Sequence, residues 1–205
     1  MSGADGDIDS IEALHALYGP PAQASLTKVV TRIEGEHARW IAASRFCVLT
    51  TVGPEGTDAS PRGDIGPVAR ILDPQTLAIP DWKGNNRLDS LRNIVRDGRV
   101  SLMFMVPGSV NVVRVNGTAR LSADPDVTGI FDDRGTLPVT VILVTVTEAY
   151  VQCAKALLRS DLWREGDRSS DVPTAGALIA EGSSGEHGGA AYDEKYRGGA
   201  LDRVW

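Results

Sequence analysis

Apolar residues along the chain follow two different periods, and six segments carry the pattern of β-strands. These segments are rich in β-branched residues and end at Gly, Pro, Asn or Asp residues. Turn residues at positions 53–56 and 73–75 predict tight connections between antiparallel strands. The predicted strands are residues 46–52, 67–73, 76–81, 99–108, 110–124 and 139–151.

Other segments place their apolar side chains on one stripe of a helix. The N-terminal region, residues 1–43, is expected to hold a short helix over residues 9–18 and a longer one over residues 25–43. Gly19-Pro20-Pro21 ends the first helix, and Ser25 can cap the second. Helices are also predicted over residues 85–97, 125–132 and 149–163, and Asn85 or Asn86 can cap the first of these three.

The C-terminal part of the chain changes in composition. Residues 164–190 are rich in Gly, Ser, Asp and Glu, which predicts a flexible surface segment with one short helix near residues 175–180. Residues 191–205 regain Tyr192, Tyr196 and Trp205, and are expected to dock on the body or on a partner subunit.

Helices interrupt the strands irregularly, without the strand–helix alternation of a doubly wound parallel sheet. The expected fold is therefore a single α+β domain over residues 1–205, built on a closed or nearly closed antiparallel barrel.

Composition excludes several classes of function. The net charge of −6 argues against general binding to nucleic acids or to acidic membranes. No segment approaches the roughly 20 apolar residues of a membrane span, and the acidic N-terminus lacks the features of a signal peptide, so a cytoplasmic protein is expected. Cys47 and Cys153 lie in apolar surroundings and are expected to be buried thiols.

Two motifs carry the chemistry of an anion site. In SPRGD (60–64), Arg62 stands between proline and glycine, where its guanidinium can fork onto a phosphate. In WKGNNR (82–87), cationic and amide side chains meet the expected start of a helix, whose free N–H groups favour an anion. The alternatives are a surface turn in which Arg62 pairs with Asp64, and an ordinary Asn-capped helix with exposed cations.

Other kinds of site find little support. His15, His37 and His187 lack metal-ligand spacing, so no metal site is expected. Neither a GxSxG elbow, a GxGxxG fingerprint nor a P-loop occurs.

Taken in order, the motifs resemble those of the FMN-binding split-barrel proteins related to pyridoxamine phosphate oxidase, and in particular a branch of FMN-dependent enzymes without assigned substrates. The resemblance implies a six-stranded antiparallel split barrel and a homodimer with FMN in two clefts at the subunit interface. The motifs are SPRGD (60–64), IPDxxGNNRxDSLRNI (79–94), FMVPG (104–108), RVNGTAR (114–120) and CAKALLRSDLW (153–163).

The resemblance also implies roles for individual residues. Arg62 and the segment from Lys83 to Arg87 would hold the phosphate and ribityl chain, with Ser60 supporting the first motif. The segment 79–81 would lie along the edge of the flavin ring, and a partner subunit would contribute from the segment 159–163. The expected cofactor-binding residues are Ser60, Arg62, Ile79, Pro80, Asp81, Lys83, Asn85, Asn86, Arg87, Arg159, Ser160 and Trp163.

Two departures from the branch bear on the substrate. Trp82-Lys83 stands where members often have an arginine, and Gln152 where they often have a histidine. The C-terminal Arg and His set of the vitamin-oxidising members is not found, so pyridoxamine phosphate oxidation is not transferred.

The leading hypothesis is an FMN-dependent oxidoreductase that uses a small-molecule electron donor or acceptor. The alternatives are a non-catalytic flavin-binding or carrier protein, and a haem or deazaflavin binder on the same barrel.

Overall fold

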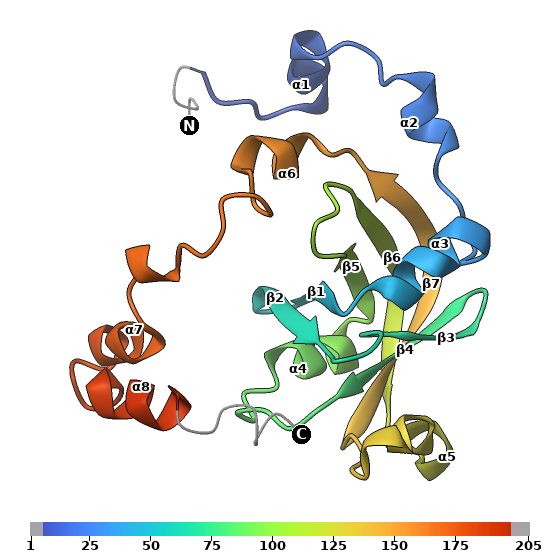
Figure 1. Ribbon diagram of the computed structural model, residues 1–205. Coiled ribbons are helices and arrows are strands. Elements are labelled where there is room, and N and C mark those ends of the chain that lie inside the picture. The colour runs from blue at the N-terminus through green and yellow to red at the C-terminus, as the bar shows by residue number, and fades with distance from the viewer. Residues whose placement is uncertain (1–5, 198–205) are drawn as a thin grey trace.

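One antiparallel sheet forms the centre of the protein in the computed structural model, which describes residues 6–197 (Figure 1). Its seven strands lie in the order β2-β1-β5-β6-β7-β4-β3, and helices flank them, so the α+β class is confirmed. All six expected strands are present. The strands are β1 (Phe46–Gly53), β2 (Gly56–Gly63), β3 (Arg70–Asp73), β4 (Thr76–Asp81), β5 (Arg99–Met105), β6 (Val112–Ser122) and β7 (Thr140–Gln152).

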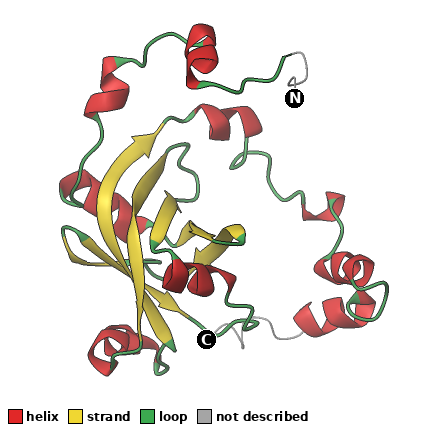
Figure 2. Ribbon diagram, turned by 180° about the vertical axis from the view of Figure 1, so that it is seen from behind, coloured by secondary structure: helices red, strands yellow, loops and turns green. Residues whose placement is uncertain are grey.

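The expectation of a six-stranded barrel that is closed or nearly closed is wrong in two respects. The sheet has a seventh strand, and its terminal strands β2 and β3 do not pair with each other, so the hydrogen-bonded sheet stays open. The strands nevertheless twist and curl strongly (Figure 2). Arg62 on β2 comes within 2.5 Å of Asp81 on β4, so that side chains rather than backbone groups join the two sides of the open sheet.

The additional strand, β2, contains most of the SPRGD motif, which the sequence predicts as a loop. It pairs with β1 over its whole length, from Gly53 opposite Gly56 to Phe46 opposite Gly63. As an edge strand, β2 tolerates Pro61 because it has a neighbour on one side only. Alternation along a strand then places the side chains of Asp58, Ser60 and Arg62 on the same face.

Several helices are shorter than their sequence patterns, and α8 has no counterpart among the expected helices. They are α1 (Ile11–Leu17), α2 (Gln23–Thr27), α3 (Gly35–Ala43), α4 (Asp89–Arg96), α5 (Pro125–Thr128), α6 (Lys155–Ser160), α7 (Ala175–Gly182) and α8 (Gly189–Arg197), with 3-10 turns η1 (Gly129–Arg134) and η2 (Ser169–Asp171).

The expected helix over residues 25–43 is divided into α2 and α3. Between them, Val30 exchanges two backbone hydrogen bonds with Ala149, at 2.9 and 2.7 Å, and thereby pairs with β7. The same pairing keeps residue 149 in a strand, so the helix expected over residues 149–163 is reduced to α6. Sheet pairing overrides helical periodicity at both positions because the extended backbone gains partners that a helix would not supply.

Two apolar clusters hold the sheet and helices together. The larger one includes the fully buried side chains of Leu49, Leu102 and Phe104 and the inner faces of α3 and α4. The smaller one lies under α5 and η1, where Phe131 packs with Val141 and the half-buried Trp82. The smaller cluster therefore fixes the turn region that follows β4.

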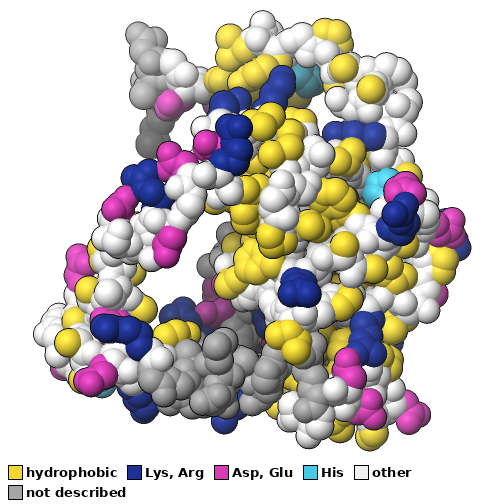
Figure 3. Space-filling view, in the orientation of Figure 1, with side chains coloured by type: hydrophobic (Ala, Val, Ile, Leu, Met, Phe, Trp, Pro, Cys, Tyr) yellow, Lys and Arg dark blue, Asp and Glu magenta, His cyan; other side chains and the backbone are white. Residues whose placement is uncertain are grey.

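The C-terminal segment forms an arm that stands away from the body, with an opening between them (Figure 3). Its helices α7 and α8 pack on each other, and the Asp193 carboxylate joins them by accepting hydrogen bonds from the Thr174 hydroxyl, at 2.6 Å, and the Gly176 amide, at 2.8 Å. The short helix expected near residues 175–180 is confirmed as α7. The flexibility of residues 164–190 stays a prediction, and residues 198–205 of the expected docking segment lie outside the described part of the chain.

The N-terminal helices also lie against little of their own chain. No residue of α1 or α2 is buried, and Ile11, Leu14 and Leu17 form an exposed apolar stripe. Over residues 6–197, no helix is long and apolar enough to cross a membrane.

A substitution at Gly117 tests the close contact between β6 and β7. It lies at a β-bulge, and a Cβ atom there would approach the Thr145 carbonyl oxygen to 2.1 Å. Because backbone atoms surround this position, Gly117→Ala is expected to lower the free energy of unfolding in urea by roughly 1–3 kcal/mol. Gly129→Ala is the control, since no atom lies within 4 Å of its Cβ position. An equal effect of both substitutions would contradict the close packing at the bulge.

The two cysteines differ, which corrects the expectation that both are buried. Cys47 is buried, and burial raises the pKa of its thiol to about 12, although Arg62 lowers it slightly. Cys153 is exposed, and a hydrogen bond from the Lys155 backbone lowers the pKa of its thiol.

Because the thiolate is the nucleophile that displaces iodide from iodoacetamide, this reagent at pH 7.5 is expected to label one cysteine per folded chain. Mass spectrometry should place the label on Cys153, and Cys153→Ser should abolish it. Labelling of Cys47 at a similar rate would show that the core is more open than its burial implies.

Candidate functional site

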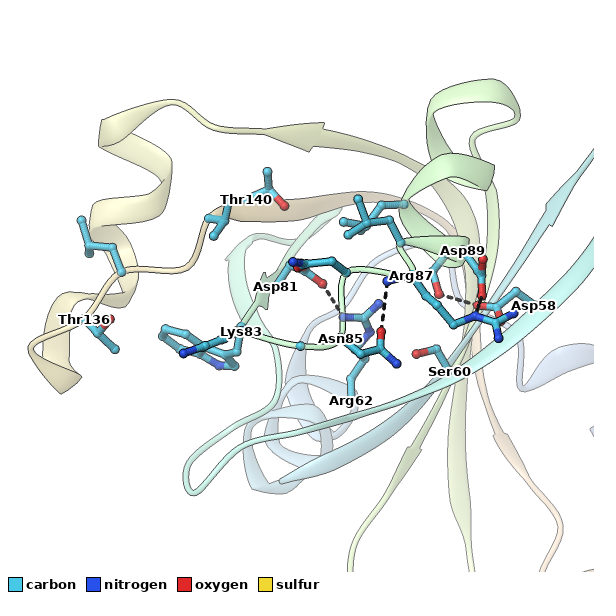
Figure 4. Close-up of a pocket in the computed structure, with 18 residues that line it drawn as sticks. Asp58, Ser60, Arg62, Asp81, Lys83, Asn85, Arg87, Asp89, Thr136 and Thr140 are labelled. Carbon is cyan, nitrogen blue, oxygen red and sulfur yellow. Dashed lines mark hydrogen bonds and ion pairs between the residues drawn. The ribbon is translucent and has the colours of Figure 1, made fainter. Parts of the chain in front are cut away.

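The two motifs meet at one pocket of about 930 Å³ (Figure 4). It lies between the outer part of β2, the end of β4, the loop 82–88, the start of α4 and the loop before β7. Its lining residues are Asp58, Ser60, Arg62, Asp81, Trp82, Lys83, Gly84, Asn85, Asn86, Arg87, Leu88, Asp89, Ser90, Leu91, Thr136, Leu137, Val139 and Thr140.

The structure brings together seven of the twelve expected site residues at this pocket and places the others elsewhere. Ile79 is buried in the core, and Pro80 lines a smaller neighbouring pocket of about 290 Å³. The residues at the pocket are Ser60, Arg62, Asp81, Lys83, Asn85, Asn86 and Arg87.

The remaining three expected residues lie in or after α6, where they do not line the pocket of their own chain. The Ser160 hydroxyl donates to the Leu157 carbonyl at 3.2 Å, and Trp163 Nε1 donates to the Ser109 carbonyl at 2.7 Å. A role for Arg159, Ser160 and Trp163 at the site of a partner subunit stays a prediction.

Arg62 is held by an ion pair across the open side of the sheet. Its Nη1 lies 2.5 Å from Asp81 Oδ1, and the two side chains are 18% and 15% exposed. The alternative that Arg62 pairs with Asp64 is wrong, since Asp64 instead accepts hydrogen bonds from Trp82 Nε1 at 3.1 Å and from the Gly66 amide at 3.0 Å. Arg62 Nε is buried and has no hydrogen-bond partner among the described residues.

The loop before α4 is ordered by its own side chains. Asn85 Oδ1 accepts a hydrogen bond from the Arg87 amide at 3.0 Å, and Arg87 Nε donates to Asp89 Oδ2 at 2.7 Å. This hydrogen bond, with the negative charge of Asp89, raises the pKa of Arg87. The expectation that Asn85 or Asn86 caps the helix is wrong: α4 begins at Asp89, and the residue before it, Leu88, makes no capping hydrogen bond through its side chain.

Two non-glycine residues of this loop have left-handed backbones, Asn86 with φ 59° and Leu88 with φ 60°. Such a conformation costs on the order of 1–3 kcal/mol for a bulky residue and persists only where the surroundings enforce it. It turns the chain sharply into α4, and the first N–H groups of the helix lack partners within the helix. These donors border the pocket, since Leu88 to Leu91 line it.

Polar contacts with the β1–β2 hairpin hold α4 in this position. The buried Ser90 hydroxyl donates to Asp58 Oδ2 at 2.5 Å, and Asn93 Nδ2 donates to the Thr51 hydroxyl at 3.1 Å. The start of the helix and the outer face of β2 are therefore fixed relative to each other.

Sequence reasoning missed one wall of the pocket. The loop 135–139 follows η1 and brings Leu137 and Val139, which are 52% and 77% exposed, to the side of the pocket opposite Asp58 and Asp89. Figure 4 shows Thr136 and Thr140 on this side. No motif marks this loop, because its position depends on how α5 and η1 pack against β4 and β7. The only available signal was two apolar residues in an otherwise polar turn.

Residues 33–153, more than half of the 205 residues, match the family model of pyridoxamine 5'-phosphate oxidase. The chain belongs to this family. The matched range contains the whole sheet, α4 and every residue that lines the pocket of this family member. No curated protein matches the chain.

The solved structures to which the chain is similar share little sequence with this member of the pyridoxamine 5'-phosphate oxidase family. HupZ of Group A Streptococcus is 17% identical, with a TM-score of 0.45 over 54% of this chain and 86% of its own. An FMN-binding protein of Syntrophomonas wolfei is 11% identical, with a TM-score of 0.41 over 57% of this chain and 80% of its own. A NimC/NimA family protein of Clostridium acetobutylicum is 12% identical, with a TM-score of 0.45 over 57% and 85%.

The ion pair between Arg62 and Asp81 generates a prediction about stability. Arg62→Ala leaves a largely buried carboxylate without its cation and is expected to lower the free energy of unfolding by roughly 1–3 kcal/mol. In a double-mutant cycle, Arg62→Ala with Asp81→Ala should cost clearly less than the sum of the single changes. The measurement is urea unfolding followed by circular dichroism.

The control is the Arg39–Glu36 pair, whose side chains are 79% and 84% exposed. Arg39→Ala should change the free energy of unfolding by less than about 0.5 kcal/mol. Purely additive effects of the changes at Arg62 and Asp81 would show that the pair does not hold the sides of the sheet together.

Proposed function

We propose that the pocket binds FMN and that the protein is an FMN-dependent oxidoreductase that works as a homodimer. The observation that carries the proposal is the convergence of both motifs on one pocket, in a chain of the pyridoxamine 5'-phosphate oxidase family. The substrate of that family's named member is not part of the proposal.

The residues present fit a flavin mononucleotide. A volume of about 930 Å³ lies in the upper part of the range of pockets for ligands of this size, roughly 300–1,000 Å³. Arg62 Nε lacks a hydrogen-bond partner among the described residues, and the first N–H groups of α4 have no acceptor within the helix. A phosphate supplies several acceptor oxygens, and a ribityl chain supplies hydroxyl groups for the polar side chains between them.

Chemistry assigns a role to each part of the lining. Arg87, Lys83 and the start of α4 would hold the phosphate, because each offers N–H donors and positive charge. The Ser60 hydroxyl and the amides of Asn85 and Asn86 would contact the ribityl hydroxyls. The backbone of residues 79–81 would contact the edge of the ring system, and Arg62 would contribute the donors that Asp81 does not use.

Bound in this way, FMN would supply one- and two-electron redox chemistry. The residues of the chain would bind, orient and shield it from water. A haem group has less support here, because none of the described residues that line the pocket is His, Cys, Met or Tyr, the usual axial ligands.

Exposed apolar surface supports the homodimer. The apolar stripe on α1 is left exposed by the described part of its own chain, and the outward side of the sheet carries the half-buried Val48 and Met103. A second copy would cover such surface and could bring the segment 159–163 to the pocket of its partner.

Binding titrations of the flavin-free protein test the cofactor and its phosphate separately. FMN should bind more tightly than riboflavin, which lacks the phosphate, and also more tightly than FAD or a deazaflavin. Arg87→Gln should weaken FMN binding by roughly 10- to 100-fold, the value of a charged hydrogen bond, and should leave riboflavin binding nearly unchanged.

Arg99→Gln is the matched control, because Arg99 pairs with Asp97 two residues away as Arg87 pairs with Asp89, yet lies outside the pocket. It should not change the affinity for FMN. Equal losses for FMN and riboflavin in Arg87→Gln would refute the phosphate assignment. Flavin binding without oxidation of NADH or NADPH, with oxygen or artificial acceptors, would favour a carrier over an enzyme.

A further inference from the structure

The pocket has a second, chemically different side. One side of the pocket, here called the apolar wall, is formed by Trp82, Leu137 and Val139. The opposite side is charged and is formed by Asp58, Arg87 and Asp89. Val139 is 77% exposed and Leu137 52% exposed, although both border a concave site where apolar side chains can be covered by a ligand.

The indole of Trp82 is held in one orientation. Its Nε1 donates to Asp64 at 3.1 Å, and its ring meets Phe131 edge to face, with centroids 6.4 Å apart and planes at 85°. Phe131 is itself buried and carries the Arg70 guanidinium 4.8 Å from its centroid. A rigid, half-buried indole at a pocket offers a surface on which a flat ring can stack with little loss of side-chain entropy.

Most of the charges at the pocket are balanced within the chain. Arg62 pairs with Asp81 and Arg87 with Asp89, while Asp58 accepts the Ser90 hydroxyl. Lys83 is the lining cation for which the described residues show no ion pair, and the phosphate of the proposed function would compensate it. Among the described lining residues, no unpaired cation is then left to attract an anionic molecule to the apolar wall.

We propose that the apolar wall binds the second reactant, and that this reactant is an uncharged, planar aromatic molecule such as a naphthoquinone. The proposal rests on the proposed function, because it assigns the charged side of the pocket to the flavin phosphate. It names a substrate class by shape and charge: a flat ring system stacks on Trp82 and covers Leu137 and Val139.

Binding of menadione, an uncharged naphthoquinone, tests the proposal without any turnover. Quenching of tryptophan fluorescence is measured on flavin-free protein and on protein saturated with FMN, with Trp82→Phe to assign the signal. The protein should bind menadione at least about tenfold more tightly than 1,2-naphthoquinone-4-sulfonate, which carries a negative charge. Val139→Asp should weaken menadione binding by about tenfold or more and leave FMN affinity within about twofold.

Val95→Asp is the matched control, since Val95 is 74% exposed and does not line the pocket. It should affect neither ligand. Equal affinity for the neutral and sulfonated probes, or no effect of Val139→Asp, would overturn the proposal. Light scattering on Val139→Asp gives a third outcome that would overturn the proposal. If this variant loses the dimer and its affinity for menadione is unchanged, the apolar wall is a subunit interface.

Failure of the proposed function gives a different pattern of results. If FMN does not bind, menadione can still saturate the flavin-free protein and respond to Val139→Asp, and only the assignment of the charged side is lost. If FMN binds normally and menadione does not, the apolar wall is not a reactant site.

Discussion

The structure depends on how far its sheet curls. Six backbone pairings join seven strands, and a seventh pairing between β2 and β3 does not form. Because each pair of neighbouring strands is rotated in the same sense, a sheet of this width brings its two sides back toward each other. Here they meet through side chains, with Arg62 on one side and Asp81 on the other. The pocket lies along this meeting line, so the curl of the sheet places the site.

The start of α4 is the other half of this arrangement. The helix is tied to the β1–β2 hairpin through Ser90 and Asp58, and it is entered through the left-handed residue Leu88. Both features fix the position of its first turn, whose residues 89–91 line the pocket. The loop 135–139 closes the opposite side, and the resulting pocket is polar at one side and apolar at the other.

Much of the fold follows from local patterns, because β-branched runs such as residues 140–146 and the turn at 73–75 decide their own conformation. The strand β2 could not be predicted in this way: GTDASPRG has little strand propensity, and its neighbour β1 supplies the hydrogen bonds that keep it extended. The division of the helix at Val30 has the same cause, since the partner is 119 residues away at Ala149. Within the site, the motifs predicted seven of the residues that meet at the pocket, whereas the ion pair of Arg62 with Asp81 depends on the curl and left no sign in the sequence.

The side-chain junction between β2 and β4 differs from the six ladders in what sequence change it permits. A ladder of backbone hydrogen bonds forms with most side chains, and it fixes the spacing of the strands. A junction of side chains depends on which residues form it and does not fix the spacing in this way. Two substitutions can alter its width, charge and polarity while every ladder stays intact. Within one sheet topology, ligand preference can therefore diverge at this line while the pairing of the strands is kept.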